Sequence, residues 1–168
     1  MKTESENEDS LNPSQLQTPG VLSKGIVVFI GRGGCCYGHI ISIDKNGNLQ
    51  YSVGTYSIPA SNGGDADAHL PENFDPNRIK VDEKYAQKNK KVPAEVLERL
   101  AKLIRDEGKL SFQDKSLVYD AYVYNVYLDN KVIAFGYDSN IKNFPENLRE
   151  LITLVISQIE LYKLPGMA

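Results

Sequence analysis

The segment from Gly31 to His39 concentrates the residue types that carry out chemistry in proteins. It holds four glycines, both cysteines of the chain and one of its two histidines, between two runs that predict β-strands. Thiols and imidazoles are the usual nucleophilic, acid-base and metal-binding groups, and glycine lets the backbone approach a ligand closely. The candidate binding residues in this segment are Arg32, Cys35, Cys36, Tyr37 and His39.

The glycine spacing does not complete a nucleotide-binding motif. From Gly33 to Gly38 it resembles a P-loop, but His39 and Ile40 stand where that motif requires Lys followed by Ser or Thr. The dinucleotide fingerprint also fails, since Cys36 occupies the position of its third glycine. We therefore interpret the glycines as a bulged connection between two strands at the rim of a sheet.

The two cysteines do not complete a catalytic or metal-binding set either. Cys36 and His39 are three residues apart, which in a strand puts them on opposite faces, so only a tight turn would pair the thiol with a base. Adjacent Cys35 and Cys36 are poorly placed to hold one tetrahedral ion or to form an unstrained disulfide. The sequence predicts no metal site and no cofactor. A thiol-dependent enzyme or redox protein using Cys35 or Cys36 remains an alternative function.

Two further groups of residues are candidates for binding. In the first, side-chain donors alternate along a loop predicted over 59–76, which we interpret as turn chemistry rather than a metal site. The residues of this group are Asp65, Asp67 and His69. In the second, Tyr122 and Tyr124 share one face of a predicted strand, and tyrosine is enriched at protein interfaces. These tyrosines either form a recognition surface or pack across strands and under loops.

Hydrophobic periodicity predicts the elements that position these residues. We expect, in order, a strand buried on both faces over 25–30, a hairpin of strands 40–43 and 49–53, a helix over 93–108, a hairpin of strands 119–128 and 131–137, and a helix after Pro145. The hairpin turns are Asp44 to Gly47, which lacks the later carboxylates of a calcium loop, and Asp129-Asn130.

These elements predict an α+β fold. We expect an antiparallel sheet of two hairpins plus an N-terminal strand, with two helices packed on one face in a ββαββα-like order. Such an arrangement leaves the opposite face of the sheet partly open, and we expect tyrosines to line it.

Length and composition indicate one globular domain. We assign residues 1–22 of the 168-residue chain to a disordered polar tail or tether and residues 23–168 to a single α+β domain. The net charge of −3 gives no reason to expect a nucleic-acid partner. We interpret the basic run of Lys88, Lys90 and Lys91 as a solvated loop or the approach to a helix. No apolar run reaches the length of a membrane span, so we expect membrane contact only through an N-terminal lipid anchor.

The polar, acidic tail leads to two expectations for localisation. Either a cytoplasmic protein begins with this tail, or Met1 replaced a removed export signal or a lipid-anchor cysteine. We favour the second, because polar and acidic linkers commonly tether lipid-anchored bacterial domains. The expected location is therefore periplasmic or at the cell surface, with the cytoplasm as the alternative.

The layout of motifs resembles an uncharacterised domain family of secreted or lipid-anchored bacterial proteins. The resemblance rests on the run from Cys35 to Ile40 leading into Ile43 to Tyr51, on Asp120 before a hairpin and on Pro145 before the last helix. It extends over about residues 24 to 163. In that family a cysteine-containing stretch precedes a strand and a turn of the Asp-Gly type, and no enzymatic residues are established. This chain departs from the family because its cysteines are adjacent, so the resemblance implies export and no activity.

These features predict a non-enzymatic, exported binding module of the kind that includes protease and hydrolase inhibitors. Its partner would be a protein, recognised by loop 59–76 and the glycine segment at one rim or by the tyrosine face. The alternatives are the thiol-dependent enzyme or redox protein and a structural subunit that associates with itself.

Overall fold

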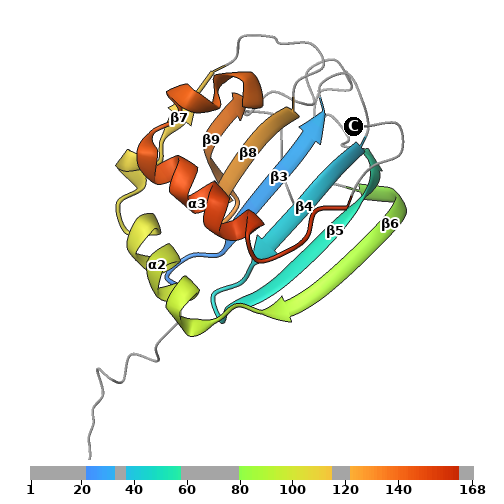
Figure 1. Cartoon of the computed structure of the whole chain (residues 1–168), viewed down its shortest axis with the longest axis horizontal. Helices are drawn as coiled ribbons and strands as arrows, with labels where there is room; N and C mark the ends of the chain where they lie inside the picture. Colours follow the sequence, from blue (N-terminus) through green and yellow to red (C-terminus); the bar gives the residue numbers. More distant parts are fainter. Residues whose placement is uncertain (1–21, 33–36, 58–79, 115–121, 163–168) are drawn as a thin grey trace, which may run out of the picture.

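A computed structural model describes residues 22–32, 37–57, 80–114 and 122–162 of the chain (Figure 1). The strands of this part are β3 (Ile26–Arg32), β4 (Tyr37–Ile43), β5 (Asn48–Ser57), β6 (Lys80–Lys91), β7 (Phe112–Gln113), β8 (Tyr122–Leu128) and β9 (Lys131–Tyr137). The helices are α2 (Ala94–Ile104) and α3 (Glu146–Ile156), and the 3-10 helices are η3 (Glu107–Lys109) and η4 (Asp138–Asn143). The predicted α+β class is confirmed.

The described strands form one sheet in the order β6-β5-β4-β3-β8-β9-β7. All neighbours are antiparallel except β7 and β9, which are parallel, so the sheet is mixed. It is larger than the predicted sheet of two hairpins plus one strand. Four consecutive strands, β3 to β6, precede α2, and the expected ββαββα-like order is therefore wrong for the first half of the chain.

Strand β6 contains the basic run that the sequence analysis assigned to a loop or helix approach, and that assignment is wrong. β6 is the edge strand next to β5, and Lys88 and Lys91 are exposed. An edge strand in contact with water needs no apolar alternation, and lysine is common there because it discourages unwanted pairing. The periodicity that identifies half-buried strands is accordingly missing from β6.

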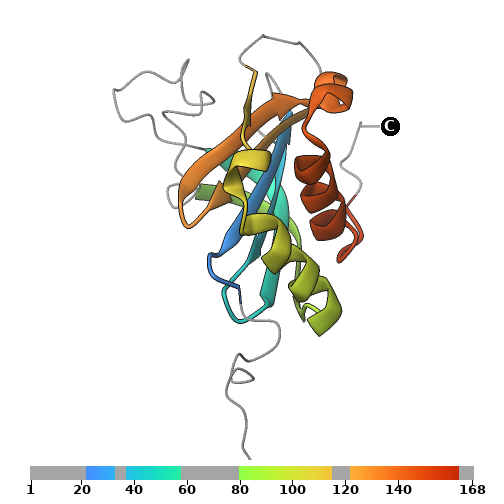
Figure 2. The ribbon, with the colours of Figure 1, turned by 90° about the vertical axis from the view of Figure 1, so that its left-hand side faces the viewer.

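The central strand β3 is buried on both faces, as predicted. Ile26, Val28 and Ile30 point to one side, which we call the core face, and Phe29 points to the other, the outer face; all four are at least 97% buried. The core-face residues belong to one hydrophobic cluster with the buried leucines of α2 and α3. Figure 2 views the sheet close to edge-on and shows α3 standing along one side of it.

Both hairpins form where they were predicted, with the expected turn residues. Asp44 Oδ1 accepts hydrogen bonds from the N–H groups of Asn46 and Asn48, each at 2.9 Å, and this fixes the turn between β4 and β5. Gly47 has φ +86°, a left-handed conformation that glycine adopts without strain. Asp129 and Asn130 have φ 48° and 72°, the positive pair that a two-residue type I′ hairpin turn requires.

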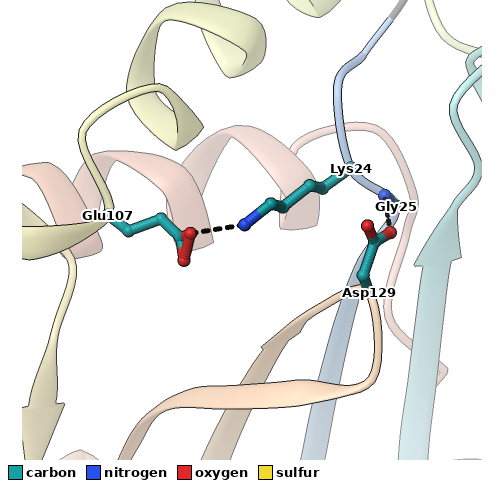
Figure 3. A network of polar contacts seen from close by, with 4 residues as sticks. All are labelled: Lys24, Gly25, Glu107 and Asp129. Atoms are coloured by element: carbon teal, nitrogen blue, oxygen red, sulfur yellow. Dashed lines mark hydrogen bonds and ion pairs between the residues drawn. The ribbon is translucent and has the colours of Figure 1, made fainter.

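The start of β3 is fixed by polar contacts to two distant segments (Figure 3). Lys24 Nζ lies 2.6 Å from Glu107 Oε2 on η3, and Gly25 N–H donates to Asp129 Oδ1 at 2.8 Å. The hydrogen bond from Lys24 lowers the pKa of Glu107. These contacts join the N-terminal end of the central strand to the β8–β9 turn and to the connection after α2.

The two helices begin directly after prolines. Pro93 precedes α2 and Pro145 precedes α3, and each proline stands at the capping position rather than inside the first turn. Helix α2 ends at Ile104, earlier than predicted, and Gly108 lies in η3. None of the helices in the described ranges is both long and apolar enough to span a membrane.

Candidate functional site

The sheet register brings five of the predicted site residues to one end of the central strands, namely Arg32, Tyr37, His39, Tyr122 and Tyr124. Ile30 pairs with His39 on one side and with Tyr124 on the other, and Arg32 pairs with Tyr122. Side chains two residues apart on a strand share one face, so Tyr37 and His39 of β4 lie on the core face together. Tyr122 and Tyr124 of β8 lie on the same face, on the other side of β3. The backbone of Arg32 lies between them, and its side chain is outside the described part of the structure.

The remaining predicted site residues lie outside the described ranges. They are Cys35, Cys36, Asp65, Asp67 and His69. The described residues next to these segments share one rim of the sheet, because Ser57 pairs with Lys80 and Tyr37 pairs with Thr55. Neighbouring strands therefore flank the glycine segment and loop 59–76 along the chain.

His39 forms a buried polar pair with Tyr51. Only 4% of His39 is exposed, and its Nδ1 lies 2.9 Å from the Tyr51 hydroxyl on β5. The two rings are stacked, with centroids 6.0 Å apart and planes at 5°. The hydroxyl also accepts a hydrogen bond from the backbone N–H of Tyr162 at 2.9 Å. His39 Nδ1, the Tyr51 hydroxyl and the Tyr162 N–H all have a hydrogen-bond partner when the hydroxyl donates to Nδ1. In that arrangement the proton of the neutral imidazole is on Nε2.

Burial sets the protonation state of this pair. It lowers the pKa of His39 from 6.5 to about 4 and raises the pKa of Tyr51 above its ordinary value. At neutral pH both side chains are therefore uncharged. A neutral imidazole whose Nδ1 is occupied by a buried tyrosine acts as a structural partner, and in this arrangement it links β4, β5 and the segment after α3.

Three further tyrosine rings contact one another in sequence, and we call Tyr37, Tyr85 and Tyr162 the tyrosine row. The centroids of Tyr37 and Tyr85 are 6.1 Å apart, and those of Tyr85 and Tyr162 are 6.0 Å apart. The three rings come from β4, β6 and the segment after α3, which Figure 1 shows in red returning along the sheet. Tyr37 and Tyr85 are half-buried, and Tyr162 is 39% exposed.

Sequence reasoning identified only one member of the tyrosine row. Tyr85 belongs to the strand that the periodicity missed, and it occupies a β-bulge, since Val53 pairs with Ala86 and Gly54 with Lys84. Tyr162 lies beyond the last helix, since α3 ends at Ile156. The abundance of tyrosine was the one available signal, and it did not indicate which rings would meet.

Tyr122 and Tyr124 lie on the core face, and the expectation that they line an open face is wrong. Both are half-buried against the main hydrophobic cluster, and Tyr124 meets Phe144 edge-on with centroids 6.3 Å apart. The outer face instead carries Phe29 and Tyr127, both almost fully buried, with Val27, Ile40 and Val132 partly buried around them. Both tyrosines of β8 therefore pack against the core, and Tyr124 contacts the segment that leads into α3.

A groove of about 410 Å³ lies at the opposite end of the sheet. Asp44 and Asp129 line it, and both carboxylates already accept backbone hydrogen bonds within the structure. The Asn48 N–H contributes most to lowering the pKa of Asp44. Lys91 Nζ donates to the carbonyl oxygen of Asn46 at 2.7 Å, beside the same turn. Asp44 thus stabilises its own hairpin turn, as predicted for the 44–47 segment, and Asp129 joins the β8–β9 turn to the residue before β3.

Within the described ranges, no three His, Cys, Asp or Glu side chains lie close enough together to hold a metal ion. Among the described residues, the tyrosine row and the adjoining buried His39–Tyr51 pair form the clearest candidate for a binding site. Comparison with known proteins adds no family: no protein-family model matches the chain, and no curated protein matches it significantly.

Proposed function

We propose that this chain is a non-enzymatic protein-binding module that recognises its partner through the tyrosine row. The observation that supports it most is the meeting of three tyrosine rings from three separate elements at one surface. Tyrosine offers a broad apolar ring and a polar hydroxyl at low entropic cost, and it is enriched in recognition surfaces for that reason.

One end of the row is anchored to a buried polar pair, which favours recognition by a rigid surface. The His39–Tyr51 pair is buried, and the Tyr51 hydroxyl holds the Tyr162 backbone in place. A surface that is ordered before binding loses less entropy when its partner arrives. A partner of this row would therefore meet rings that are already positioned.

The inhibitor type remains the preferred class of module. An inhibitor needs a rigid scaffold and a presented segment, and the seven described strands supply the scaffold. We infer that both helices cover the core face, since their buried leucines join one cluster with Ile26, Val28 and Ile30. Loop 59–76 lies between β5 and β6 in the sequence.

Export of this module also stays a prediction, which fractionation of the native cells would test.

Site-specific photocross-linking tests the proposal. A photoreactive phenylalanine analogue replaces Tyr162 or Tyr85, and a matched control carries it at Gln50, which is exposed on the outer face. We expect one protein adduct of defined mass from positions 162 and 85 in native cells and none from position 50. The same adducts from all three positions, or none from any, would contradict recognition through the row.

The thiol-dependent alternative predicts a different result. A catalytic cysteine needs a thiolate at neutral pH, and hence a thiol pKa below the usual value of about 8.5. Titration of the two thiols with an alkylating reagent across pH 5 to 10 separates the functions, because ordinary reactivity of both supports a binding module.

A further inference from the structure

The edge of the sheet at β6 is a second surface, separate from the tyrosine row. Within the described part of the chain β6 pairs with β5 alone, and it is 12 residues long. An edge strand presents a line of backbone N–H and C=O groups to its open side. These groups make β6 a potential template for another extended segment.

The half of β6 that follows the bulge is regular. Pairing with β5 runs without interruption from Asn48 and Lys91 to Val53 and Ala86, and the register shifts beyond that point. An added strand needs a continuous row of backbone groups with an even twist. The stretch from Ala86 to Lys91 provides it, whereas the bulge at Tyr85 interrupts it.

The charge of β6 opposes that of the whole chain. The strand carries five lysines and two acidic residues, an excess of three positive charges, while the chain has a net charge of −3. The lysines are Lys80, Lys84, Lys88, Lys90 and Lys91. This local excess makes the edge attractive to an acidic segment and repulsive to a basic one.

Three of these lysines donate hydrogen bonds to neutral oxygen atoms, and the charge of Lys91 also helps to lower the pKa of the Asp44 carboxyl group. Lys84 donates to the amide oxygen of Gln87 at 2.9 Å, and Lys90 lies 3.5 Å from that of Gln158. Lys91 donates to a backbone carbonyl at 2.7 Å. Hydrogen bonds to neutral oxygens position an ammonium group but do not cancel its charge.

We propose that the edge from Ala86 to Lys91 binds an extended acidic segment of a partner protein by strand addition. The backbone of the segment would pair with β6, and its carboxylates would meet the lysines. A second copy of β6 is a poor occupant, because pairing two such strands would set like charges opposite one another. The lysines thus repel self-association and select for an acidic strand.

The test uses a fluorescent peptide of about eight residues, with Glu alternating with Thr and Val, in about 0.15 M salt. The whole chain should bind it saturably. The Lys88→Glu/Lys90→Glu variant should lose at least about tenfold in affinity and should gain affinity for a Lys/Thr/Val peptide. A control with the same change in charge, Lys102→Glu/Lys142→Glu, alters exposed lysines on α2 and η4 and should bind the acidic peptide as the wild type does.

A peptide with N-methyl groups on alternate residues separates strand addition from attraction between surface charges. It keeps every carboxylate but loses backbone donors, so the wild type should bind it at least about tenfold more weakly. Equal binding of the methylated peptide would overturn the proposal, and this measurement does not depend on the folding of any variant. A dimer that the Lys88→Glu/Lys90→Glu change dissociates would also overturn it, since the edge would then serve a second copy.

Discussion

The buried pair of His39 and Tyr51 should make the protein acid-sensitive in a defined pH range. Burial lowers the pKa of His39 in the folded state to about 4, while the unfolded chain has the ordinary value of 6.5. The folded state therefore binds this proton more weakly than the unfolded state does. Stability from the neutral imidazole is fully present above pH 6.5, declines below it, and is lost once the pH has fallen to about 4.

The size of the effect follows from the difference between the two pKa values. Each unit corresponds to 1.36 kcal/mol, so the full loss is about 3 kcal/mol, and about 2.5 kcal/mol of it is already gone at pH 4.5. With a typical urea dependence of about 1–3 kcal/mol per M, this loss lowers the denaturation midpoint by about 1–3 M. His39→Gln keeps a polar partner for the Tyr51 hydroxyl but does not titrate.

The assay is urea denaturation of the wild type and of His39→Gln at several pH values from 7.5 to 4.5. His39→Gln should be less stable at neutral pH, and the gap between the two chains should close by about 2.5 kcal/mol toward pH 4.5. Since carboxylates and His69 are present in both chains, the change in this gap reports on His39. Parallel pH profiles would refute the reasoning, because they would mean that His39 is protonated equally in the folded and unfolded states.

Three further predictions concern single substitutions. Tyr51→Phe should cost about 1–3 kcal/mol in urea denaturation, because His39 Nδ1 stays buried without its donor; unchanged stability would contradict the pairing. Gly54→Ala should cost about 1–3 kcal/mol, since the added methyl group meets the β6 backbone. Gly108→Ala, where the methyl group has only ordinary contacts, is its control and should change stability by less than about 0.5 kcal/mol. Glu107→Gln should shift the denaturation midpoint only slightly, because both side chains of its ion pair with Lys24 are partly exposed to solvent; a large shift would contradict this reasoning.

The elements with strong local signals were predictable from the sequence. The run from Ile26 to Ile30 is apolar throughout because β3 is buried on both faces. The turns at Gly47 and Asp129-Asn130 need positive φ, and their residue types indicate it. Both long helices follow a proline and carry an apolar stripe. In each of these cases the structural requirement constrains residues that are close together in the sequence, so the local pattern reveals it.

The features that depend on distant residues were not predictable in the same way. Strand β6 is stabilised by pairing with β5, and its exposed lysines carry no alternating pattern. The tyrosine row depends on a bulge at Tyr85 and on α3 ending at Ile156, so that the following segment returns to the sheet at Tyr162. His39 was a candidate site residue from its type alone, but its partner Tyr51 follows from the β4–β5 register.

The most direct test of the proposed function is an affinity measurement with the cross-linked partner once it is purified. Isothermal titration would compare the wild type with Tyr162→Ala, Tyr85→Ala and the outer-face control Gln50→Ala. We expect losses of at least about tenfold for the two tyrosine variants, as for aromatic hot spots, and an unchanged dissociation constant for Gln50→Ala. Wild-type affinity in both tyrosine variants would contradict recognition through the tyrosine row.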